Sequence, residues 1–135
     1  MPGARDDLKT MLGWNIGVYR QGTEATEPAT FESDSADRVA VWQTGLGGLR
    51  WIDDLVEQGR AVALGGNGYP LRYTARAADL VPVIEQGPPN ANTHWIYGVN
   101  DTLGPAWDGK TVFHEDVARD CSPDEWLLIE AWDES

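Results

Sequence analysis

The 135-residue sequence predicts a single α+β domain with a mixed or antiparallel sheet of about five or six strands, one principal amphipathic helix and one or two short helices. Several short stretches are rich in β-branched and aromatic residues, which favour strands. Only one stretch has a clear helical period, and glycine, proline and asparagine separate the stretches at turns. No repeat and no linker divides the chain, so we expect an N-terminal tail over residues 1–12 and one domain over residues 13–135.

The first two strands are predicted at Gly13–Gln21 and Arg38–Gln43. The first alternates apolar with small or polar residues, as a strand with one buried face does. The second, RVAVWQ, is β-branched and apolar enough for a central position in the sheet. Residues 22–37 between them are polar, rich in acids and without a hydrophobic period. A connection of about sixteen residues is long for a compact domain, so we expect it to be mobile or functional.

The principal helix is predicted in the stretch LGGLRWIDDLVEQGR, which covers residues 46–60. Its apolar residues fall on one stripe at helical spacing, and its charged residues point elsewhere. Gly59 supplies a C-terminal stop, because glycine adopts the left-handed conformation that ends many helices. The apolar stripe consists of Leu49, Ile52, Leu55 and Val56.

A hairpin is predicted to follow this helix. Ala61–Leu64 has the composition of a short buried strand, and Tyr69–Ala75 has that of its hairpin mate. Asn67 and Gly68 lie between them, and both residue types tolerate the positive φ angles of a tight turn. The glycine-rich stretch ALGGNGYP is therefore interpreted as a turn rather than as a phosphate-binding loop.

The second half of the chain contains weaker patterns. Residues Ala77–Val81 favour a helix that Pro82 should interrupt, because proline lacks the amide hydrogen and clashes with the preceding turn. Thr93–Val99 is aromatic and β-branched, as a strand is. Ser122–Glu125 has the form of an N-cap, a first-turn proline and a capping-box glutamate, which predicts a helical turn. The following WLLIEAW, residues 126–132, fits a closing strand or a continued helix, and we favour the strand.

The glycine cluster TGLGGLR, Thr44–Arg50, lies between a strand and a helix, where free amide groups can bind an anion. The dinucleotide pattern fails, because Arg50 occupies the position of its third glycine. The phosphate-loop pattern fails as well, because no Gly-Lys-Ser/Thr follows. Turns before the helix explain these glycines, and a small-anion site assisted by Arg50 is the alternative.

The residues that could serve a metal or a nucleophilic mechanism are few. His94, His114 and Cys121 form neither a helical two-histidine motif nor a paired-cysteine motif, so we expect no metal and no cofactor. A thiol needs a base to react, and the acids around Cys121 should raise its pKa and disfavour the thiolate. No set of residues predicts catalysis, and a role other than catalysis is favoured.

The net charge excludes some classes of partner. The chain has 22 acids against 10 bases, which gives −12. Direct nucleic-acid binding depends on Lys and Arg that neutralise phosphates, and such a charge opposes it; binding to anionic membranes is disfavoured likewise. No apolar run approaches the roughly 18 residues that span a bilayer, and the acidic pair near the N-terminus does not fit a signal peptide. We expect a cytoplasmic protein.

The negative charge is concentrated near the C-terminus. Residues 101–135 contain ten acids and two bases, whereas residues 38–76 carry a net +2. Seven Trp and four Tyr are more than a small core needs, and such residues often anchor interfaces. We therefore predict an acidic interaction or inhibitor protein, of the immunity type or the phage type, that binds a basic partner such as a toxin or a nucleic-acid enzyme. A solvated surface that only aids solubility is the plainer interpretation of the acids.

Eight of the ten basic residues are Arg, and this preference for Arg over Lys favours a bacterial source. The residues predicted to contact the partner combine the acids of the last stretch with an aromatic anchor, which is Trp107 or Trp126. They are Trp107, Asp116, Asp120, Asp124, Glu125 and Trp126.

An alternative is a small enzyme or small-ligand-binding domain with a pocket that combines convergent polar and aromatic groups. The residues that would line this pocket are Arg50, His94, Trp95, Tyr97 and His114. A third possibility is a subunit or adaptor of a larger assembly, which would expose an apolar patch of several hundred Å2 instead.

Overall fold

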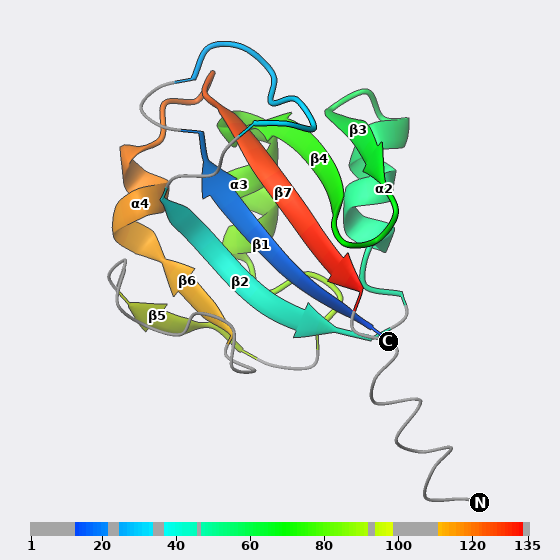
Figure 1. The fold of residues 1–135 in the computed structure, drawn as a ribbon. Coiled ribbons are helices and arrows are strands. Elements are labelled where there is room, and N and C mark those ends of the chain that lie inside the picture. Colours follow the sequence, from blue (N-terminus) through cyan, green and yellow to red (C-terminus); the bar gives the residue numbers. More distant parts are fainter. Residues whose placement is uncertain are drawn as a thin grey trace, which may run out of the picture.

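A computed structural model describes residues 13–21, 25–33, 37–45, 47–91, 94–98 and 111–133. Within these ranges the chain forms one mixed seven-stranded sheet in the order β3-β4-β7-β1-β2-β6-β5, together with three helices (Figure 1). The tail expected over residues 1–12 lies outside them. The elements are β1 (Trp14–Arg20), β2 (Arg38–Thr44), α2 (Arg50–Glu57), β3 (Ala61–Gly66), β4 (Leu71–Arg76), α3 (Ala77–Glu85), β5 (Ile96–Gly98), β6 (Val112–His114), α4 (Glu115–Asp120) and β7 (Trp126–Asp133).

The α+β class and the mixed sheet are confirmed, and the count of about five or six strands is slightly too low. The strand that sequence reasoning missed is β6. It has three residues, too few for an alternating pattern to be visible, and it pairs antiparallel with β2 and parallel with β5. The other neighbouring pairs of strands are antiparallel.

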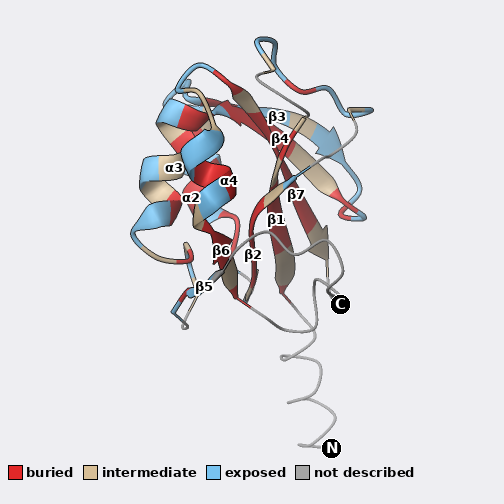
Figure 2. Ribbon diagram, turned by 90° about the vertical axis from the view of Figure 1, so that its left-hand side faces the viewer, coloured by how far each residue is buried: buried red, intermediate tan, exposed pale blue. Residues whose placement is uncertain are grey.

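The core lies between the sheet and the helices, which Figure 2 shows on one side of the strands. β7 is an interior strand of the sheet and pairs along its length with β1 on one side and β4 on the other. Ile129 lies opposite both Val18 and Tyr73 in these ladders, and all three side chains are buried. Such continuous burial explains why the apolar WLLIEAW stretch becomes a strand, as predicted.

The principal helix α2 forms where the apolar stripe predicts it. Leu49, Ile52 and Leu55 are buried, and Gly59 ends the helix with φ +74°. The glycines before the helix form turns, in which the Gly48 N–H donates to the Gly45 carbonyl at 3.1 Å. This geometry agrees with the prediction that the glycines of the TGLGGLR cluster form turns before the helix.

The hairpin is confirmed, because β3 pairs antiparallel with β4. Its turn spans residues 67–70, where Gly68 has φ +96° and the Asn67 Oδ1 accepts a hydrogen bond from the Tyr69 N–H at 3.0 Å. The expected burial of Ala61–Leu64 is wrong for most of that stretch. β3 is the edge strand of the sheet, so only its first residue, Ala61, is buried.

The interruption expected at Pro82 does not occur, because α3 continues through this residue to Glu85. Leu80 and Ile84 are fully buried on either side of it, so packing on the sheet holds both halves of the helix. The helix gives up one backbone hydrogen bond at the proline, and this burial outweighs that loss. The Trp95 Nε1–H also donates to the Ile84 carbonyl at 2.7 Å, which satisfies a group at the helix end.

The helical turn expected at Ser122–Glu125 forms only as a single turn and starts no helix. The chain makes a single turn in which the Glu125 N–H donates to the Ser122 carbonyl at 3.0 Å, and then enters β7. The capping-box contact exists, since the Ser122 N–H donates to Glu125 Oε1 at 3.4 Å. The pairing of β7 on both sides stabilises the extended backbone after it, so no helix follows.

The connection between β1 and β2 packs on the sheet in its described part, residues 25–33. Ala29 is buried, and its N–H donates to Thr74 Oγ1 at 3.0 Å. The Ala25 carbonyl accepts a hydrogen bond from the Trp126 N–H at 2.9 Å. In Figure 1 this segment lies over the upper ends of β4 and β7.

No helix in the described part of the chain has the length and apolar character needed to cross a bilayer.

The proline in α3 generates a stability prediction. Pro82→Ala should raise the free energy of unfolding by about 1 to 3 kcal/mol, because it restores a helical hydrogen bond and removes a steric clash at an exposed position. Urea unfolding followed by circular dichroism measures the change. Pro123→Ala, at an exposed proline outside the helices, is the control and should lower stability by about 0.4 to 1 kcal/mol. A loss of stability in Pro82→Ala would contradict this account.

Candidate functional site

The acids predicted to bind a partner lie along α4 and the turn that follows it. Asp116, Asp120 and Asp124 are exposed. Trp126, at the start of β7, is half-buried, and the Arg76 guanidinium lies 5.1 Å from the centre of its ring. Trp107 falls outside the described residues. Asp116 and Asp120 lie one turn apart on α4, and Asp124 follows in the turn before β7.

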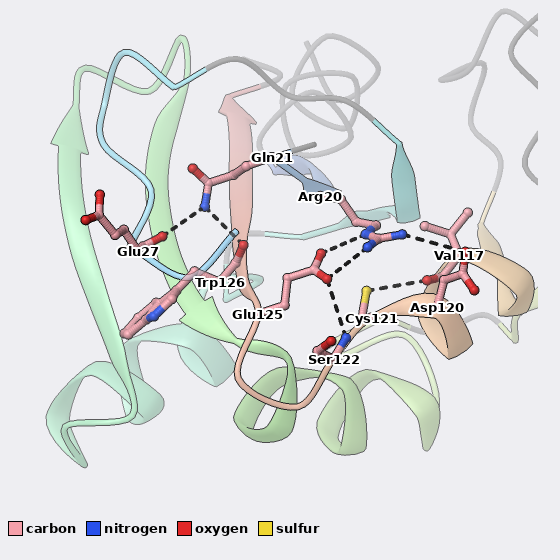
Figure 3. Close-up of polar contacts among 9 residues, drawn as sticks. All are labelled: Arg20, Gln21, Glu27, Val117, Asp120, Cys121, Ser122, Glu125 and Trp126. Atoms are coloured by element: carbon pink, nitrogen blue, oxygen red, sulfur yellow. Dashed lines mark hydrogen bonds and ion pairs between the residues drawn. The ribbon is translucent and has the colours of Figure 1, made fainter. Parts of the chain in front are cut away.

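Glu125 differs from the other predicted contact residues, because it is buried and ion-paired. Its carboxylate accepts two hydrogen bonds from Arg20, from Nε at 2.7 Å and from Nη2 at 2.9 Å (Figure 3). Glu125 is 1% exposed and Arg20 6%. The last residue of β1 thus reaches the turn before β7, where burial and a bidentate geometry make the ion pair well ordered. Glu125 is not part of the exposed acidic surface.

Cys121 lies beside this ion pair. Its Sγ–H donates to the Val117 carbonyl at 3.4 Å, and Asp120 Oδ2 lies 3.8 Å from Arg20 Nη1 (Figure 3). Burial, followed by the negative charge of Glu125, raises the pKa of the Cys121 thiol from 9.0 to about 11. The direction agrees with the sequence-based expectation, although burial contributes more than the acids. The thiol is therefore a poor nucleophile near neutral pH.

The five residues of the alternative pocket come from different parts of the described structure, and they differ in exposure. Arg50 begins α2 and is exposed, and His94 is exposed before β5. His114 is 2% exposed, and the Nε and Nη2 atoms of Arg38 both lie 3.4 Å from its Nε2. Trp95 is buried, whereas Tyr97 is exposed.

Aromatic side chains form a continuous chain from the core to the surface. Trp42 contacts Trp51 and Trp95, with ring centres 5.6 and 5.5 Å apart. Phe113 continues the chain, because its ring centre lies 5.5 Å from that of Trp95 and 5.9 Å from that of Tyr97. Edge-to-face and tilted contacts of this kind are favourable and directional. The buried tryptophans therefore support the exposed ring of Tyr97 at the end of the chain.

Tyr97 lines a cavity of about 280 Å3, which we name the α4 pocket. Its walls come from the end of α3, from β5 and β6, and from α4. The Arg119 Nη2 lies 3.2 Å from Glu115 Oε2 at this pocket. The lining residues are Glu85, Tyr97, Phe113, Glu115, Ala118 and Arg119. Of these residues only Tyr97 belongs to the pocket predicted from the sequence, because no motif connects Glu85 with residues of α4 that follow about thirty positions later.

A second cavity of about 190 Å3 lies between α3 and α4, and mostly apolar residues such as Ala78, Val81 and Pro82 line it.

Within the described ranges, no group of three or more His, Cys, Asp or Glu side chains is placed to hold a metal ion. Comparison of the chain with known protein families, with curated proteins and with solved structures gives no match.

The buried ion pair should be essential for stability. Glu125→Gln should lower the free energy of unfolding by about 3 kcal/mol or more, because it leaves the Arg20 charge buried without its counter-charge. The matched control is Glu115→Gln, which breaks the exposed pair with Arg119 and should cost less than about 1 kcal/mol. Urea unfolding measures both changes. Equal losses in the two variants would show that the burial of the Arg20–Glu125 pair is not decisive.

Cys121 should react slowly with alkylating reagents in the folded protein. A pKa of about 11 leaves roughly a hundredfold less thiolate at pH 8 than a pKa of 9.0 does. The iodoacetamide rate, followed by mass spectrometry, should rise about tenfold per pH unit up to about pH 11. Because the folded-state pKa is the higher one, the neutral thiol stabilises the fold below about pH 9, and this contribution is lost as the pH rises toward 11. A rate that levels off near pH 9 without unfolding would contradict the shift; the urea-unfolded chain is the reference.

Proposed function

We propose that this protein is a non-enzymatic interaction protein that binds a basic partner protein through an acidic face on α4 and the adjoining segments. The acidic face consists of Glu85, Glu115, Asp116, Asp120 and Asp124. The observation that carries the proposal is the exposure of three aspartates along α4 and the following turn, beside a pocket that two glutamates line. Arg119 is the basic residue of α4 itself.

Electrostatic steering is the physical basis of this proposal. A net charge of −12 attracts a cationic protein over a distance of about one Debye length, and the local excess of acids orients the encounter. A basic toxin or a nucleic-acid enzyme presents the positive surface that otherwise binds phosphates. Carboxylates that occupy such positions would exclude nucleic acid from that surface, as in an immunity-type or phage-type inhibitor.

The alternative of a ligand pocket built from Arg50, His94, Trp95, Tyr97 and His114 receives less support. Trp95 and His114 are buried among core residues, and Arg50 lies on α2, the helix that packs near β3 at the other end of the sheet. A binding role for the exposed acids agrees better with the positions of the described side chains.

Differential affinity capture tests the proposal. Three baits are compared: the wild-type chain, a face variant with Asp116→Lys and Asp124→Lys, and a control variant with Asp54→Lys and Glu57→Lys on the exposed side of α2. Both variants change the net charge by the same amount. From a lysate of cells that produce the protein, wild type and control should retain the same basic protein, released as salt rises. The face variant should bind it about tenfold or more weakly, because two attractive contacts become repulsive.

Two results would contradict this function. Equal loss of the captured protein in both variants would mean that overall charge, and not the acidic face, causes retention. Retention of the same proteins by all three baits would mean that the face does not take part in binding.

A further inference from the structure

We propose that the α4 pocket accepts an arginine side chain of the basic partner. This inference rests on the proposed function and assigns its specificity to one cavity. Three properties of the pocket lead to it: an aromatic wall, carboxylates from two separate elements, and a volume of about 280 Å3. This volume lies just below the range of about 300 to 1,000 Å3 that is usual for small-molecule sites, so one side chain fits it better than a cofactor does.

The aromatic wall is the pair of Tyr97 and Phe113. Their rings meet edge to face, with an interplanar angle of 87°. Phe113 is 3% exposed and anchored in the core, whereas Tyr97 is 57% exposed. An exposed tyrosine ring on a rigid support is a suitable surface for a guanidinium group, which stacks on aromatic faces more readily than an ammonium group does.

The carboxylates give the pocket its negative character. Glu85 comes from the end of α3 and Glu115 from the start of α4. In the described part of the chain, Glu85 makes no ion pair, whereas Glu115 pairs with Arg119 at 3.2 Å. The pocket thus holds one more acid than base. Such a lining repels phosphates and carboxylates and favours a cation.

The Arg119–Glu115 pair indicates how an incoming arginine would bind. The Arg119 side chain is 78% exposed and that of Glu115 is 47% exposed, so the pair contributes little free energy and opens readily. An arginine from a partner would stack on Tyr97 and donate hydrogen bonds to Glu85, which makes no ion pair among the described residues. Glu115 would complete the site after Arg119 moves aside. Arg119 is therefore a competitor for the incoming guanidinium.

Nuclear magnetic resonance titration with small probes tests this pocket without the partner. N-acetyl-L-arginine N-methylamide is added to the isotope-labelled full chain, and amide shifts are followed. The citrulline analogue, nearly isosteric and neutral, and the lysine analogue are the reference probes. We expect saturable shifts at Tyr97, Phe113 and Ala118 with the arginine probe, and at least about tenfold weaker binding of citrulline, because it lacks the charge.

Substitutions in the pocket test the contribution of single residues to binding. The amide spectrum of each variant shows whether it is folded. Glu85→Gln and Tyr97→Leu should each weaken the arginine probe several-fold, whereas Tyr97→Phe should retain binding. Glu57→Gln on α2 removes the same charge as Glu85→Gln and should have no effect. Arg119→Ala should strengthen binding about two- to fivefold, because the competing ion pair is lost.

The outcomes separate this inference from the proposed function. Equal binding of citrulline, equal binding of lysine, or equal effects of Glu85→Gln and Glu57→Gln would overturn the arginine pocket. If partner capture still depends on Asp116 and Asp124 in that case, the acidic-face function stands without the pocket. If the arginine probe binds as expected but the face variant retains every captured protein, the pocket stands and the proposed function fails.

Discussion

The bidentate ion pair between Arg20 and Glu125 is the interaction on which the arrangement of the helices depends. It ties the end of β1 to the turn between α4 and β7. The same turn holds the start of α3, because the Glu125 carbonyl accepts a hydrogen bond from the Ala77 N–H at 2.8 Å and the Pro123 carbonyl accepts one from the Ala78 N–H at 2.9 Å. One buried charge pair thus fixes the relative position of α3 and α4. These are the two helices that contribute Glu85 and Glu115 to the α4 pocket.

The chain of aromatic side chains holds the other wall of this pocket in place. Trp42 is fully buried in β2, and its Nε1–H donates to the Pro89 carbonyl at 3.1 Å, which fixes the connection between α3 and β5. The Phe113 ring contacts both the buried ring of Trp95 and the exposed ring of Tyr97, so Tyr97 packs on the core. An exposed aromatic ring that rests on a packed core loses little conformational entropy on binding. Rigid support of this kind is what a specific contact with a partner side chain requires.

Sequence patterns predicted the parts of the fold in which one chain segment determines its own structure. The amphipathic stripe and Gly59 define α2, and apolar alternation defines β1, because these signals are local. The continuity of α3 through Pro82 depends on tertiary packing, which overrides local preference. The burial of Glu125 was not predictable either, since its partner lies 105 residues away. The α4 pocket escaped prediction for the same reason, because distant segments assemble it.

Most of the described arginines make their contacts away from the acidic face. Arg72 binds Glu130 at 2.9 Å, and Arg60 binds Asp79 at 3.2 Å. Arg38 and Arg76 contact His114 and the Trp126 ring instead of carboxylates. The Nε and Nη2 atoms of Arg20 bind buried Glu125. Its Nη1 atom lies 3.8 Å from Asp120 Oδ2. In the described part of the chain, Arg119 pairs with Glu115 at 3.2 Å, yet the acidic face still holds more acids than bases, and a cation supplied from outside the chain would complete the neutralisation of this surface.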